Sequence, residues 1–179
     1  MKKCIETDTL NRHIAMLHDK GIDHALIVET SKIFTAPWVR LKCQFGCAGY
    51  GERLSCPPHT PTPEQTRTIL DSYTRAILLH RHWQKDYKVV AHFNDIVVEL
   101  ETALFLDGFH KAFGMGSGPC TMCAACDTSG RCKNTEKARP SMEACGIDVF
   151  KTAREHNLSI RVVRNRKEER DIFGLVLIE

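Results

Sequence analysis

The sequence predicts an α/β or α+β fold, a layered sandwich with a mixed sheet of about four strands. Apolar runs of strand length alternate along the chain with segments of helical periodicity, and long stretches rich in Gly, Pro and Cys separate some of them. The 179 residues are 42% hydrophobic and 26% charged, as in folded globular proteins. We therefore expect one domain over residues 1–179.

The first part of the chain is expected to supply a helix and two strands. Residues 10–20 repeat apolar side chains at helical spacing, and Gly21 is placed to end that helix in a left-handed conformation. The apolar runs 25–28 and 76–79 have the length of short strands. Each of these two runs predicts one strand of the sheet.

The segment 32–63 is expected to be a site-forming loop, because it combines little periodicity with many Gly, Pro and Cys residues. A helix is expected directly after it. Thr62 can cap this helix, Pro63 suits the first helical position, and Gln65 completes a capping box. The helix is predicted to end near Ser72.

The second half of the chain predicts two more helices and two more strands. A long helix is expected to begin at residues 94–95 and to end at Gly114, with five largely buried side chains: Val97, Leu100, Leu104, Phe105 and Phe109. Another helix is expected over 140–156. The apolar runs 160–163 and 172–178 predict a hairpin, and a hairpin beside helical crossovers makes the predicted sheet mixed.

Nine cysteines are the most informative feature of the composition, since an odd number argues against a disulfide framework and for metal or redox chemistry. The basic start at residues 1–3 is followed by polar residues where a signal peptide would be apolar, so a cytoplasmic protein is expected. No apolar run approaches a membrane span, and a dispersed net charge of +3 does not indicate a nucleic-acid surface. The expected partners are a redox protein or a small-molecule substrate.

Four cysteines, Cys120, Cys123, Cys126 and Cys132, form a C-x2-C-x2-C-x5-C pattern. Two-residue gaps allow one turn of chain to wrap three thiolates around a cubane, whereas zinc ribbons use two separated C-x2-C pairs. This pattern favours a [4Fe–4S] cluster, with zinc as the alternative. Cys132 is the natural fourth ligand, although ferredoxins place three residues, not five, before a final Cys-Pro.

A second group consists of Cys43, Cys47 and Cys56, followed by two prolines. Three thiolates supply three of the four ligands that a zinc ion or a second cubane needs. The fourth ligand is open: His59, Cys145 and Cys132 are candidates. A substrate or water at an exposed iron is another, and it would make the site a Lewis-acid catalyst. The alternative is that these thiols are merely buried beside the first cluster.

The two groups lie within longer motifs, at residues 43–51, 56–58, 118–126, 139–144 and 146–149. With these motifs the chain resembles a family of small prokaryotic proteins of unknown function that are described as predicted metal-binding proteins. The resemblance implies a metal or iron–sulfur site formed by the cysteines, and it leaves the reaction and the substrate open.

Two further sets of residues are candidates for a functional site. His80, His82 and His92 can converge, although none has the i, i+4 spacing of a helical zinc motif, and each can equally be a core or surface histidine. Three charged residues flank the cysteine loop and are candidates for substrate binding: Arg139, Glu143 and Asp148. Helix capping and ion pairing explain the same residues equally well.

The sequence therefore predicts a single metal-binding domain with one [4Fe–4S] cluster, or two, and a redox or electron-transfer role. One alternative is an iron–sulfur enzyme whose open iron acts on a small thiol, sulfide or hydroxy acid. The other is a zinc-stabilised interaction module. Catalytic residues are not identified by the sequence.

Overall fold

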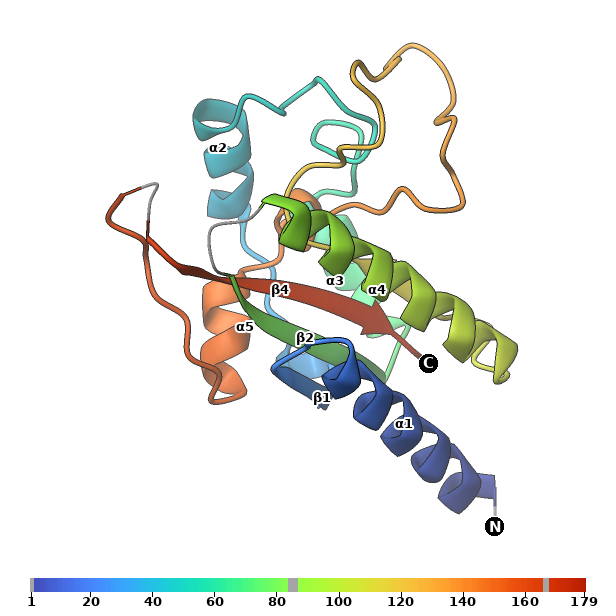
Figure 1. Cartoon of the computed structure of the whole chain (residues 1–179). Coiled ribbons are helices and arrows are strands. Elements are labelled where there is room, and N and C mark those ends of the chain that lie inside the picture. The colour runs from blue at the N-terminus through green and yellow to red at the C-terminus, as the bar shows by residue number, and fades with distance from the viewer. Residues whose placement is uncertain (1, 84–86, 166–167) are drawn as a thin grey trace.

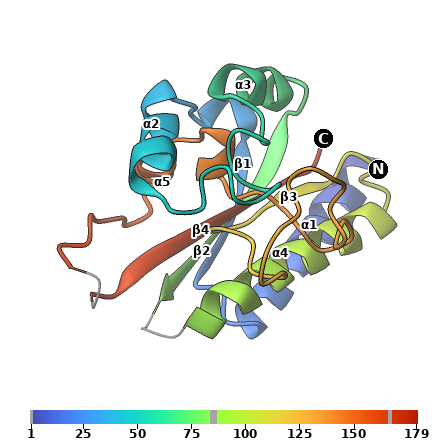
Figure 2. The same ribbon diagram turned by 90° about the horizontal axis from the view of Figure 1, so that it is seen from above.

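The computed structural model describes residues 2–83, 87–165 and 168–179, and the side chains of residues 7–83, 88–165 and 168–179. Four strands form one open sheet with helices packed on both faces (Figures 1 and 2). In spatial order the strands are β1 (His24–Glu29), β2 (Arg75–Trp83), β4 (Arg170–Leu177) and β3 (Phe113–Met115).

Within the described residues, five α-helices and two short 3-10 helices accompany the strands. Helices α1 (Lys2–Asp19) and α4 (Tyr87–Leu106) cover one face of the sheet (Figure 2). The other face carries α3 (Pro63–Asp71), α5 (Val149–Glu155) and the 3-10 helix η2 (Glu143–Cys145). Helix α2 (Pro37–Gly46) stands beside this second face, after the 3-10 helix η1 (Thr30–Lys32). No described helix has the length and apolar character needed to cross a bilayer.

The α+β class and the number of strands, four within the described residues, are confirmed, but the prediction of a mixed sheet is wrong because neighbouring strands pair antiparallel. Every pair of neighbouring strands is antiparallel: β1 with β2, β2 with β4, and β4 with β3. The crossover through α4 does make β3 run in the same direction as β2. Strand β4 then inserts between them and pairs antiparallel with both, so a helical crossover does not lead to parallel pairing.

The predicted strand at 160–163 is also wrong, because this segment is neither helix nor strand. Strand β4 pairs with β2 along its whole length and with β3 at residues 175–177, so both of its neighbours in the sheet are other strands. Strand β3 was not predicted, since three residues around a glycine carry no strand signal. Gly114 therefore lies inside a strand and does not end a helix.

Four helix predictions need correction, and the first is that of α1, which begins at Lys2 and not near residue 10. The helix predicted over 140–156 is split at Gly146, whose φ of 76° breaks it into η2 and α5. Helix α4 begins earlier than predicted and ends at Leu106, and Phe105 on it is 56% exposed instead of buried. Helix α2 lies inside the predicted loop, with Pro37 at its first turn and only Val39 buried.

The predicted capping box is confirmed. Thr62 Oγ1 accepts a hydrogen bond from the backbone N–H of Gln65, and Gln65 Oε1 accepts one from the N–H of Thr62. Asp148 caps α5 in a similar way, since its carboxylate accepts a hydrogen bond from the Lys151 N–H. Both helix starts are therefore fixed by residues next to them in the sequence.

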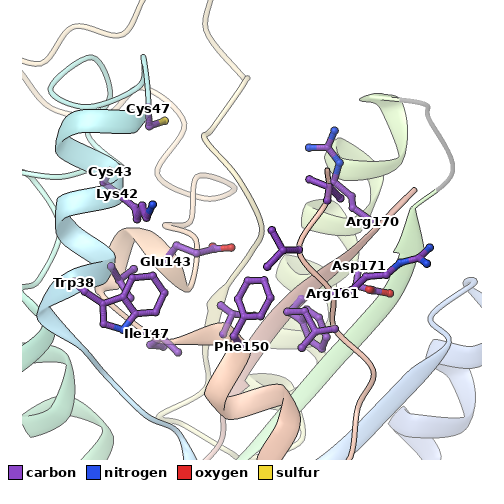
Figure 3. Close-up of a pocket in the computed structure, with 16 residues that line it drawn as sticks. Trp38, Lys42, Cys43, Cys47, Glu143, Ile147, Phe150, Arg161, Arg170 and Asp171 are labelled. Carbon is purple, nitrogen blue, oxygen red and sulfur yellow. The ribbon is translucent and has the colours of Figure 1, made fainter. Parts of the chain in front are cut away.

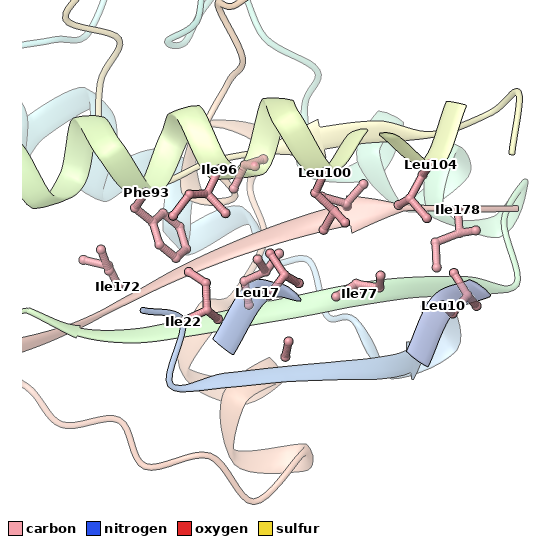
Figure 4. Close-up of a cluster of buried hydrophobic side chains, with 14 of the residues drawn as sticks. Leu10, Leu17, Ile22, Ile77, Phe93, Ile96, Leu100, Leu104, Ile172 and Ile178 are labelled. Carbon is pink, nitrogen blue, oxygen red and sulfur yellow. The ribbon is translucent and has the colours of Figure 1, made fainter. Parts of the chain in front are cut away.

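Two hydrophobic cores lie on opposite faces of the sheet because strand side chains alternate between faces. Helices α1 and α4 pack on the first core, where Leu10, Leu17, Phe93 and Leu104 are at most 3% exposed (Figure 4). The second core lies under α3, η2 and α5 and is formed by 15 buried residues, including Met142.

Helix α4 packs unusually close to the sheet because β4 has Gly174 at the contact. A Cβ atom at Gly174 would lie 2.9 Å from Phe93 Cε1 and 3.0 Å from Val97 Cγ2. Phe93 is fully buried, so its ring has no space into which to move. The glycine therefore sets the distance between the helix and the sheet.

We expect Gly174→Ala to destabilise the protein by about 1–2 kcal/mol, because overpacking outweighs the roughly 0.5–1 kcal/mol gained from a less flexible unfolded chain. Urea unfolding would measure this change. Gly46→Ala in α2 is the matched control, since a Cβ there meets no atom within 4 Å. Equal stability of Gly174→Ala and the wild type would contradict the close packing.

Candidate metal centre

The three-cysteine group is assembled at the end of α2. Cys43 lies in the last turn of the helix, Cys47 directly follows it, and Cys56 lies in the turn-rich loop beyond. A Cβ built on Gly49 would be 3.6 Å from the sulfur of Cys47 and 3.8 Å from the sulfur of Cys56. The loop thus brings these two sulfurs, 9 residues apart in the sequence, close to one backbone position.

The electrostatics of this group favour a bound cation. Burial raises the pKa of Cys43 and of Cys56, and the neighbouring Cys47 thiol raises both pKa values further. Arg40 opposes the shift at Cys43, and Arg53 opposes it at Cys56. A soft metal binds thiolates, so it would relieve the repulsion among three grouped sulfurs and release their protons. The donor set fits such a metal.

Arg40 fixes α2 to the rest of the fold. Its Nη1 donates to the hydroxyl of Thr60 and to the backbone carbonyl of Ala144, both at 2.9 Å. Thr60 closes the cysteine loop and Ala144 lies in η2, so one guanidinium connects three segments. The position of Cys43 on α2 is therefore tied to η2.

The four-cysteine group lies on an excursion of the chain, residues 118–139, that contains neither helix nor strand. Its cysteines are all partly exposed. Asn134 contacts two of them: its Nδ2 donates to Cys123 Sγ at 3.1 Å, and its backbone N–H donates to Cys132 Sγ at 3.4 Å. N–H donors at sulfur are typical of iron–sulfur sites.

Both ends of this excursion are anchored to α4. Glu101 accepts two hydrogen bonds of 2.7 Å from the Arg139 guanidinium, and both side chains are largely buried. At the other end, the Asn94 amide bonds the N–H of Ser117 at 2.8 Å and its carbonyl at 3.0 Å. A parallel bridge between Gly116 and Ser141 closes the loop.

The two cysteine groups lie side by side, although more than sixty residues separate them in the sequence. Pro119 Cβ is 3.7 Å from the Cβ position of Gly49, next to the sulfurs of Cys47 and Cys56. The Arg53 guanidinium donates to the backbone carbonyl of Cys123 at 3.4 Å. Within the described residues, no three His, Cys, Asp or Glu side chains are already arranged around one metal position. The assignment of ligands to either group stays a prediction.

The candidates for a fourth ligand differ in their surroundings. Cys145 is 1% exposed in the second core, and burial raises its pKa to about 12, which keeps it a thiol. The structure places it as a core residue. His59 is exposed on the cysteine loop. The side chain of Cys4 lies outside the described residues.

A cavity of about 420 Å³ opens beside the three-cysteine group, between α2, η2, α5 and the start of β4 (Figure 3). Cys43 and Cys47 lie on its α2 wall, and Glu143 of η2 points into it. The segment 160–163, once predicted as a strand, forms the opposite wall. Its size is that of a small-molecule site.

The family comparison agrees with this chemistry. A model of a family described as predicted metal-binding protein (DUF2284) matches residues 26–178. The chain belongs to this DUF2284 family. The matched residues include both cysteine groups, η2 and the cavity walls. Comparisons with curated proteins and with solved structures gave no match.

The charged residues that flank the cysteine loop in this DUF2284 chain have different roles. Arg139 pairs with Glu101 and Asp148 caps α5, so the structural explanation holds for both. Glu143 lines the cavity, where its Oε2 atom is buried and has no hydrogen-bond partner among the described residues. Burial raises the pKa of this carboxyl. Only Glu143 is placed to meet a ligand.

Two of the three histidines converge, on a strand rather than on a helix. His80 Nε2 and His82 Nδ1 lie 2.9 and 3.2 Å from the same oxygen of Asp171, which also lines the cavity. His80 further contacts His24, with 2.9 Å between their Nδ1 atoms. His92 lies apart, exposed on α4. Residues at i and i+2 of a strand lie on the same face, so the spacing of His80 and His82 within β2 could have predicted that these two side chains lie together.

His82 predicts a pH-dependent contribution to stability. Hydrogen bonds to Glu169 and Asp171 raise its pKa, while Asp23 contacts only its backbone N–H. The contribution is therefore fully present below the unfolded-state pKa of about 6.5 and is lost as pH rises through the folded-state value. With a 36% exposed side chain, it should stay below about 1 kcal/mol.

Urea unfolding of His82→Gln should thus show a loss of stability relative to wild type at pH 5.5 that disappears at pH 9. His92→Gln is the control and should show no such difference, because His92 is exposed on a different element. An equal loss for His82→Gln at both pH values would contradict the charged hydrogen bonds.

Proposed function

We propose that this metal-binding protein is a cytosolic iron–sulfur protein with a redox role. The first centre is a [4Fe–4S] cluster held by Cys120, Cys123, Cys126 and Cys132. A second metal is held by Cys43, Cys47 and Cys56. Clusters of this kind supply one-electron chemistry when bound. The partner is a redox protein or a small-molecule substrate.

The contact between the two cysteine loops is the observation that carries this proposal. Arg53 and Gly49 of one loop touch Cys123 and Pro119 of the other. Two centres built on these loops would be neighbours, with one in a partly exposed loop and the other beside the cavity. Such an arrangement suits electron passage between the surface and an enclosed site.

Zinc would use the same thiolates without redox chemistry. Three cysteines spaced by two residues favour a cubane, and Asn134 supplies the N–H donors that cluster sulfurs accept. A zinc-stabilised module also gives no reason for a cavity next to the thiols. Metal analysis of the purified protein distinguishes an iron–sulfur protein from a zinc-stabilised module.

Cys123→Ser should remove one cluster and lower the thermal midpoint, because metal-binding energy contributes to folding in loops of this kind. Iron and acid-labile sulfide would be measured on anaerobically purified protein. Cys145→Ala is the matched control and should keep its iron, since that thiol lies in the core. A colourless wild type with stoichiometric zinc, or full iron in Cys123→Ser, would contradict the proposal.

The cavity favours a second candidate function, an enzyme whose three-cysteine site keeps one metal position open. Three thiolates leave one metal coordination site for an exchangeable ligand, and Cys43 and Cys47 both line the cavity. A small thiol, sulfide or hydroxy acid would reach the metal from that side. The chain's own contribution is to bind and orient this molecule and to shield it from water.

If the site is an open cubane, added thiol should perturb the electron paramagnetic resonance spectrum of the reduced protein. Mild oxidation should give a [3Fe–4S] signal, because an iron with an exchangeable ligand is readily lost. Cys56→Ser should abolish both effects and spare the other cluster. An unchanged spectrum together with only one cluster per chain would exclude the open cubane.

A further inference from the structure

The cavity beside Cys43 and Cys47 has a mainly apolar interior. Its walls include Trp38 from α2, Ile147, and Phe150 from α5 (Figure 3), together with Phe173 of β4. Aromatic and aliphatic walls of this kind bind the hydrocarbon part of a small organic molecule. Its volume of about 420 Å³ suits a small organic molecule.

Two exposed cations at the cavity have no partner among the described residues. Lys42 on the α2 side and Arg161 on the opposite side form no hydrogen bond or ion pair with any described residue. Of the other charged groups of the walls, Asp171 is held by His80, Arg170 stacks on Trp83 at 4.1 Å, and Glu143 remains. Two free cations beside an apolar interior favour an anionic ligand.

Glu143 supplies a third feature. Part of its side chain reaches the surface, but its Oε2 atom is buried and lacks a hydrogen-bond partner among the described residues. Buried polar atoms in folded proteins nearly always have partners, so an unpaired oxygen in a cavity wall indicates a missing donor. A hydroxyl group on the ligand would provide that donor.

We propose that the cavity binds a 2-hydroxy carboxylic acid with an apolar side chain. The apolar part packs against Trp38 and Phe150, the carboxylate lies in the positive field of Lys42 and Arg161, and the hydroxyl donates to Glu143 Oε2. This proposal deepens the second candidate function by assigning its substrate class, but it rests on the cavity residues and not on the identity of the metal.

Isothermal titration of the metal-loaded protein with 3-phenyllactate and 2-hydroxyoctanoate tests the proposal. At least one should bind, and 3-phenylpropanoate, which lacks the hydroxyl, should bind about tenfold more weakly than 3-phenyllactate. 1-Phenyl-2-propanol, an alcohol that keeps the hydroxyl of 3-phenyllactate and lacks the carboxylate, should bind more weakly than 3-phenyllactate by a similar factor. Iron and sulfide are measured on the same sample. A failure to bind can then be assigned to the cavity and not to loss of the cluster.

Two variants of cavity residues test whether the hydroxy acids bind in the cavity. Arg161→Gln should weaken both hydroxy acids about three- to tenfold without affecting the alcohol, and Glu143→Leu should remove the difference between 3-phenyllactate and 3-phenylpropanoate. Lys32→Gln on η1, outside the cavity, is the matched control and should bind as wild type does. Thermal melts confirm that each variant is folded.

The proposal is overturned if neither hydroxy acid binds to folded, metal-loaded protein. It is also overturned if the alcohol binds as tightly as the acid, or if folded Arg161→Gln and Glu143→Leu both bind as wild type does. None of these results affects the iron content, so the iron–sulfur proposal is judged separately.

Discussion

The close packing of α4 against glycines of the sheet is the constraint on which the rest of the structure depends. Gly174 and Gly114 let Phe93 and Val97 approach the strands directly. The same helix then presents Asn94 to the backbone that enters the four-cysteine loop and Glu101 to the Arg139 side chain at its other end. Larger side chains in place of these glycines would move α4 outward and take Asn94 and Glu101 away from the ends of the loop. The position of the four-cysteine loop therefore depends on how the core packs.

The cysteine loops combine a rigid base with an adaptable interior. Hydrogen bonds from Arg40 and the Glu101–Arg139 pair hold their ends, whereas the loop cysteines other than Cys56 are partly or fully exposed. Few apolar contacts stabilise the segments between, so metal coordination would supply the ordering free energy there. The thiols therefore need not stand at bonding distance before a metal arrives.

Sequence reasoning predicted the features that local chemistry decides. The Thr62 capping box and the runs that become β1, β2 and β4 are determined by neighbouring residues. The antiparallel order was not predictable, because the place of β4 between β2 and β3 depends on contacts between segments far apart in the chain. The cavity was missed for the same reason: its walls come from α2, η2, α5 and β4. Cysteine spacing suggested two groups, and it left their contact as one of several alternatives because that contact depends on tertiary structure.

The three charged residues after the cysteine loop show how structure separates roles that sequence leaves equal. Arg139 has its charge matched by Glu101, and Asp148 has its carboxylate used by a helix N–H. Both interactions stabilise the fold whether or not the protein binds a ligand. Among the described residues, the Oε2 atom of Glu143 has no hydrogen-bond partner, and it lies at a cavity wall. A ligand in the proposed site would supply the missing hydrogen bond, whereas the charges of Arg139 and Asp148 are already used within the fold.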